Sequence, residues 1–86
     1  MTSIDLTNLY GKDVFIFTSS HIEKTFKISY STNFNKATEN SYKRNSTIVG
    51  ANDWNNMMDT FNEYNSNYKL IKYSKKVRTK YPELFL

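Results

Sequence analysis

Residues 13–32 read DVFIFTSSHIEKTFKISYST and contain the two clearest strand patterns of the chain. Residues 13–18 are mostly β-branched or aromatic and are apolar on both faces, which is typical of a central strand. Residues 24–32 alternate between apolar and polar side chains, as expected of a strand with one face against a core. The apolar face carries Phe26, Ile28 and Tyr30. Residues 19–21 supply a turn, so the pattern predicts an antiparallel hairpin.

The segments on either side of this hairpin predict a short helix and a third strand. Residues 3–11 have a capping serine, an early acidic residue and a closing glycine, which together indicate a short helix. Residues 33–40 read NFNKATEN and are predicted to form a polar connection. Residues 41–49 read SYKRNSTIV, a weaker alternating pattern that predicts a third strand ended by Gly50.

The clearest helix begins after Asn52 or Asp53, either of which is a suitable N-cap residue. Apolar side chains then recur at the 3.6-residue spacing of one helical face, so we predict that they pack in the core. This stripe consists of Trp54, Met57, Met58, Phe61, Tyr64 and Tyr68. In the alternative, Trp54, Met57 and Met58 form an adaptable protein-binding surface, because Met and Trp are common in such surfaces.

The sequence after residue 68 allows two interpretations. Apolar residues recur at helical spacing, which favours one basic helix over residues 69–80 that ends before Pro82. These apolar residues are Leu70, Tyr73, Val77 and Tyr81. In the alternative, residues 69–73 form a fourth strand and Ser74 caps a shorter helix. Residues 84–86, which read LFL, form an apolar tail that we expect to dock on the rest of the protein.

These patterns predict a single α+β domain over residues 1–86. It consists of a short N-terminal helix, a three-stranded antiparallel sheet, an amphipathic helix and a basic C-terminal helix. No cysteine is present, which excludes disulfides and fits a reducing compartment. The N-terminus lacks a signal-peptide pattern, and no apolar run approaches the roughly 20 residues that span a bilayer. We therefore expect a cytoplasmic protein with no membrane partner.

Positive charge is concentrated near the C-terminus. Residues 69–86 hold six basic residues and one acidic residue, a net charge of +5, whereas residues 1–68 hold six basic and seven acidic residues, a net charge of −1. The predicted binding residues of this segment are Lys69, Lys72, Lys75, Lys76, Arg78 and Lys80, with Lys43 and Arg44 as secondary candidates. A cationic patch on an otherwise neutral protein indicates a polyanionic or acidic partner.

The predicted order of helix, three strands and helix over residues 3–68 resembles that of double-stranded RNA-binding domains. In that family a histidine after the first strand reaches the RNA minor groove, and the resemblance implies the same role for His21. In that family the second helix begins with a lysine-rich motif. The sequence departs from the family at this place, because residues 53–56 read DWNN and contain no basic residue. The resemblance therefore implies His21 alone as an RNA contact.

In size and composition the chain also resembles the small early accessory proteins of T-even and other low-GC phages. Asn, Lys, Tyr and Ser are abundant in it, and it has only two Gly and one Pro. We therefore predict a non-enzymatic inhibitor or modulator of a host nucleic-acid-processing or defence enzyme. It would act on a host protein or nucleoprotein through the basic patch, with RNA a better candidate than DNA. The alternative is a direct RNA- or DNA-binding domain with no protein target.

Catalytic and metal-binding patterns are not found in the sequence. His21 is the only histidine, and without cysteine it cannot build a typical zinc site. An enzyme such as a nuclease would need His21 together with carboxylates such as Asp13 or Glu23. Two glycines, Gly11 and Gly50, are too few for a glycine-rich phosphate loop. We therefore predict no catalytic residue, no metal and no cofactor.

The assignment of Trp54 to the core leads to a test of stability. A core tryptophan replaced by alanine costs about 3–5 kcal/mol, so Trp54→Ala should lower the free energy of unfolding by that amount in a chemical-denaturation experiment. A value within about 1 kcal/mol of the wild type would instead place Trp54 on the surface.

Overall fold

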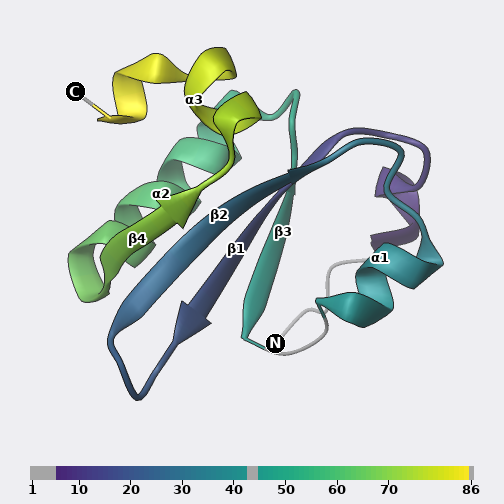
Figure 1. Cartoon of the computed structure of the whole chain (residues 1–86). Helices are drawn as coiled ribbons and strands as arrows, with labels where there is room; N and C mark the ends of the chain where they lie inside the picture. Colours follow the sequence, from purple (N-terminus) through teal and green to yellow (C-terminus); the bar gives the residue numbers. More distant parts are fainter. Residues whose placement is uncertain (1–5, 43–44, 86) are drawn as a thin grey trace.

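The computed structural model describes residues 6–42 and 45–85 and shows an α+β fold built on one mixed sheet (Figure 1). Its four strands are β1 (Val14–Ser20), β2 (Thr25–Ser31), β3 (Ser46–Gly50) and β4 (Lys69–Tyr73). Its α-helices are α1 (Lys36–Ser41), α2 (Trp54–Asn67) and α3 (Lys75–Lys80). Two short 3-10 helices, η1 (Leu6–Leu9) and η2 (Pro82–Phe85), lie near the two ends of the described chain.

The predicted hairpin is confirmed and forms the centre of the sheet. β1 and β2 pair antiparallel over seven residues, from Val14 opposite Ser31 to Ser20 opposite Thr25. β3 pairs antiparallel with the other edge of β1, and the strand order is β3-β1-β2-β4. The three predicted strands are thus antiparallel, but the sheet also has a fourth strand, because β4 pairs with β2 in parallel.

Residues 69–73 are a strand, so the prediction of one basic helix over residues 69–80 is wrong and the alternative is right. The free edge of β2 supplies backbone partners: the Lys69 amide donates to the Lys24 carbonyl, and the Ser74 amide donates to the Ile28 carbonyl. The register skips Ile71 at a bulge, which turns both Leu70 and Tyr73 toward the core. Leu70 and Tyr73 are three residues apart, so a bulged strand produces the same spacing as a helix.

The main core lies between one face of the sheet and the helices α2 and α3. Phe15 and Phe17 of β1 and Phe26 and Ile28 of β2 supply the sheet side, as the alternation predicts. The remaining buried members are Val49, Ala51, Met57, Phe61 and Val77. Leu84 and Phe85 pack against this cluster, which confirms the predicted docking of the apolar tail for these two residues, while Leu86 lies outside the described residues.

A smaller core covers part of the opposite face, where η1 and α1 lie (Figure 1). It contains Val14, Ile16, Phe34 and Ile48, and Phe34 is fully buried. The prediction of a polar connection over residues 33–40 is wrong, because α1 begins after Asn35, whose side chain accepts a hydrogen bond from the Thr38 amide. The sequence gives little sign of this helix, since Ala37 is its only apolar residue.

Two other predicted elements are shorter in the structure. The N-terminal helix over residues 3–11 is represented by η1, and its predicted capping serine, Ser3, lies outside the described residues. The third strand, predicted over residues 41–49, begins at Ser46, because Ser41 still belongs to α1. The secondary binding candidates Lys43 and Arg44 lie outside the described residues.

The amphipathic helix α2 begins as predicted, with the Asp53 side chain accepting a hydrogen bond from the Asn56 amide. Met57 and Phe61 are buried, but Trp54 keeps 37% of its surface exposed. The placement of Trp54 in the core is therefore wrong. It occupies the first turn of the helix, where its ring packs on Tyr81 rather than on the sheet.

No helix among the described residues is both long enough and apolar enough to cross a lipid bilayer.

The loss of stability caused by substitutions in α2 should follow these differences in burial. Met57 is 1% exposed, so we expect Met57→Ala to lower the free energy of unfolding by about 2–4 kcal/mol. Trp54→Ala removes mainly one ring contact from a partly exposed site and should cost about 1–2 kcal/mol, less than the sequence predicted. Urea denaturation of the two variants measures both values, and a larger loss for Trp54→Ala would contradict this packing.

Candidate anion-binding groove

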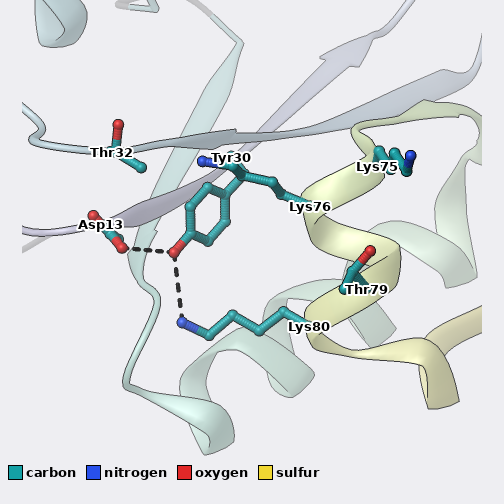
Figure 2. Close-up of a pocket in the computed structure, with 7 residues that line it drawn as sticks. All are labelled: Asp13, Tyr30, Thr32, Lys75, Lys76, Thr79 and Lys80. Carbon is teal, nitrogen blue, oxygen red and sulfur yellow. Dashed lines mark hydrogen bonds between the residues drawn. The ribbon is translucent and has the colours of Figure 1, made fainter.

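An open groove of about 560 Å³ lies between α3 and the adjoining ends of β1 and β2. Its lining consists of Asp13, Tyr30, Thr32, Lys75, Lys76, Thr79 and Lys80 (Figure 2). Three of the six predicted basic residues of the C-terminal segment are therefore brought to one place. The groove joins two parts of the chain that are far apart in sequence, residues 13–32 and residues 75–80.

The lysines reach the groove because α3 is fixed in position. The Ser74 side chain caps the helix by accepting a hydrogen bond from the Val77 amide, and the Val77 side chain is buried in the main core. Lys76 and Lys80 are four residues apart and therefore lie on the same face of the helix. Their ammonium nitrogens lie 5.6 and 5.5 Å from the centre of the Tyr30 ring, which is within cation–π range.

Tyr30 is itself held from three sides. Its ring packs edge-on against Phe15, with the ring centres 5.2 Å apart. Its hydroxyl donates a hydrogen bond of 2.7 Å to Asp13 Oδ2 and accepts a longer one, 3.5 Å, from Lys80 Nζ (Figure 2). Burial, followed by the hydrogen bond to Asp13 and the negative charge of Asp13, raises the pKa of Tyr30 to about 12. The phenol is therefore neutral near pH 7 and does not offset the charge of the lysines.

The positive charge of the groove has little internal compensation. Over residues 6–42 and 45–85, the single ion pair with a nitrogen–oxygen distance of 4.0 Å or less joins Lys36 to Glu39, on α1. Asp13 is the carboxylate that lines the groove, and its hydrogen bond is to a tyrosine hydroxyl rather than to a lysine. Lys75, Lys76 and Lys80 are exposed and thus available to an external anion.

The other predicted basic residues do not line the groove. Arg78 donates a hydrogen bond of 2.7 Å to the Tyr73 hydroxyl, and its guanidinium carbon lies 5.9 Å from the centre of that ring. Lys69 and Lys72 lie on β4, where Lys72 pairs with Lys27 of β2. Since Phe26 and Ile28 on either side of Lys27 face the main core, Lys27 and Lys72 point to the opposite face of the sheet.

His21 lies in the exposed turn between β1 and β2, at the end of the hairpin opposite to Tyr30. Its implied role as an RNA contact stays a prediction. Asp13 precedes β1 and His21 follows it, so the seven-residue strand, about 23 Å long, separates them. The structure thus does not bring His21 and Asp13 together as an acid–base pair. Among the described residues no three His, Asp or Glu side chains gather in a way that could hold a metal ion.

Sequence reasoning missed the groove residues contributed by the hairpin. Tyr30 was predicted as one more apolar position of its strand. Asp13 was predicted as the start of the preceding strand and as a carboxylate that a nuclease would need, but not as part of a binding site. Their link to α3 depends on a contact across 50 residues, between Tyr30 and Lys80. One signal was present: Tyr30 is the last residue on the apolar face of its strand, where a tyrosine hydroxyl can reach solvent.

Comparison of the chain with models of protein families, with curated proteins and with solved structures finds no match.

The Tyr30–Asp13 hydrogen bond leads to a pH-dependent prediction. Tyr30→Phe should lower the free energy of unfolding by about 1 kcal/mol at neutral pH, because the hydrogen bond is lost. The pKa of Tyr30 is raised in the folded protein from 10.0 to about 12, so its contribution is complete below pH 10 and is lost as the pH rises toward 12.

Urea denaturation of both proteins between pH 7 and pH 11 measures this difference. We expect a constant gap in stability up to about pH 9 and a smaller gap above pH 10. Tyr42→Phe is a control, because Tyr42 packs on the smaller core and not in the groove. A gap that does not change up to pH 11 would contradict the assigned role of the Tyr30 hydroxyl.

Proposed function

We propose that this protein is a non-enzymatic binding module whose basic groove binds an extended anionic partner. The observation that supports this most directly is the pair Lys76 and Lys80, both directed over the ring of Tyr30 and neither paired with a carboxylate among the described residues. Lysines on most protein surfaces are simply solvated. Here two adjacent ones are positioned by a capped helix and a fixed aromatic ring.

The chemistry of the lining suits phosphate or carboxylate groups. Ammonium groups neutralise such anions, and charge-assisted hydrogen bonds are stronger than neutral ones. Thr32 and Thr79 add two hydroxyl donors at the sides of the groove. Lysine and hydroxyl side chains together are typical of contacts to a phosphate backbone. The open shape of the groove fits a partner that extends beyond it.

The more specific role predicted from composition is that of a phage-type inhibitor of a host nucleic-acid-processing or defence enzyme. It stays a prediction, supported by chain size and residue usage alone. Its test is affinity capture from a bacterial lysate treated with nuclease, followed by an assay of the captured enzyme with added protein. An enzyme that is captured and inhibited would support this role. An enzyme that is captured but stays fully active would count against it.

Removal of the two groove lysines tests the binding function directly. We expect Lys76→Gln/Lys80→Gln to weaken binding to labelled 12-mers of RNA or DNA by roughly tenfold in fluorescence anisotropy. Two lost phosphate contacts should also reduce the slope of log affinity against log salt by about 1.4 for single strands.

Lys27→Gln/Lys36→Gln is the matched control, since it removes the same net charge from sites outside the groove. It should bind with nearly the affinity and the salt slope of the wild type. If both double variants lose affinity equally, binding depends on net charge and not on the groove. If the wild type binds no polyanion even at low salt, the proposed function is wrong.

A further inference from the structure

Trp54 is the largest side chain that α2 leaves exposed, and it is the only tryptophan in the chain. Its ring packs against Tyr81, with the ring centres 4.6 Å apart and the planes inclined by 35°. Among the described residues, Tyr81 is its only ring partner. Trp54 keeps 37% of its surface exposed, so its ring is accessible to a partner.

The support beneath Trp54 is rigid. Tyr81 donates a hydrogen bond from its hydroxyl to the Ala51 carbonyl, and its ring lies 5.1 Å from that of Phe15. Phe15 is fully buried and also contacts Tyr30. A continuous series of rings therefore connects Trp54 to the tyrosine under the groove lysines. Because the Trp54 ring already packs on Tyr81, part of its side-chain freedom is lost before a partner binds, which reduces the entropy cost of binding.

A second hollow, of about 610 Å³, is lined by Trp54 and lies beside the basic groove. The two hollows share the lining residue Asp13. The polar lining residues of the second hollow are Lys12, Asp13, Asn52, Asp53 and Asn55, so it carries two carboxylates and one lysine. A partner that lies along both hollows would meet the lysines of α3 in the groove. In the second hollow it would meet Lys12, two carboxylates, two side-chain amides and the ring of Trp54.

We infer that Trp54 stacks on an unpaired base of a single-stranded nucleic acid whose phosphates lie along Lys76 and Lys80. This inference rests on the proposed function and names its partner. Single-stranded nucleic acids are bound by cationic grooves combined with aromatic side chains, because each base offers a flat π-face. In a duplex those faces are covered by neighbouring base pairs. The Asn52 and Asn55 amides can donate and accept hydrogen bonds at the base edges.

An acidic protein surface is the main competitor as a partner. Its carboxylates would use the lysines, and its apolar side chains could pack on the indole ring, because Trp is common in protein-binding surfaces. A nucleic acid places its phosphates and its rings at a short, regular spacing along one chain. The juxtaposition of Trp54 with the basic groove therefore favours a partner that carries both phosphates and rings. Asp13, at the junction of the two hollows, would repel a continuous row of phosphates and favours a base or sugar at that point.

Intrinsic fluorescence provides the test, because all of the tryptophan signal comes from Trp54. The full chain is titrated with 12-mers of U or dT, with polyphosphate of similar charge and with polyaspartate. We expect the oligonucleotides to quench the fluorescence of Trp54 to a saturating level. Polyphosphate should compete for the groove and leave most of the fluorescence unchanged.

Variants then measure the contribution of the ring. Trp54→Ala should weaken binding of the oligonucleotides by roughly 5- to 150-fold, the range found when a stacked aromatic is lost. Trp54→Phe should retain most of the affinity, and both variants should bind polyphosphate as the wild type does. Urea denaturation of each variant verifies that it is folded under the conditions of binding.

The outcomes separate this inference from the proposed function. If oligonucleotides and polyphosphate both bind, but Trp54 is not quenched and Trp54→Ala binds normally, the stacking role is overturned and the groove remains an anion site. Equal binding of polyaspartate and oligonucleotides, independent of Trp54, also overturns it and indicates an acidic protein partner. If none of the three polyanions binds, both proposals fail.

Discussion

The parallel pairing of β4 with β2 is the constraint on which the rest of the structure depends. It carries the chain along the edge of the hairpin and delivers Ser74 next to Ile28, two residues before Tyr30. The helix capped by Ser74 therefore begins beside the end of β2, and its lysines can reach the tyrosine. A single helix over residues 69–80 would have made no backbone hydrogen bonds to β2 and would not have fixed this position.

Phe15 connects the core to the candidate site. It belongs to the central strand, is fully buried, and contacts both Tyr30 and Tyr81. Tyr30 supports the lysines of the groove, and Tyr81 supports Trp54. The two parts of the proposed binding surface are thus supported by the same side chain of the main core. Their relative position is set by close packing in the interior, which is stiffer than a surface loop.

The sequence predicted those parts of the fold that depend on local patterns. The hairpin and the capped helix α2 each have a periodicity that appears within a few residues, and the hydrogen bond of Asp53 matches the expected cap. For residues 69–73 the sequence favoured a helix over the strand β4. The bulge of β4 gives Leu70 and Tyr73 a helical spacing, and its partner strand lies 44 residues earlier. For the same reason the lysines of the site were predicted, while Asp13 and Tyr30 were not: charge is visible in composition, but a contact across the sheet is not.

The groove has one consequence for how the protein folds. Its two walls come from residue 13 at the start of the sheet and residue 80 at the end of α3. Contacts this distant in sequence slow folding, because the chain loses entropy when it closes a long loop before the contacts form. A chain that stops before α3 would contain the hairpin but no cationic wall. The proposed binding of an anion therefore requires that the C-terminal segment has docked on the sheet.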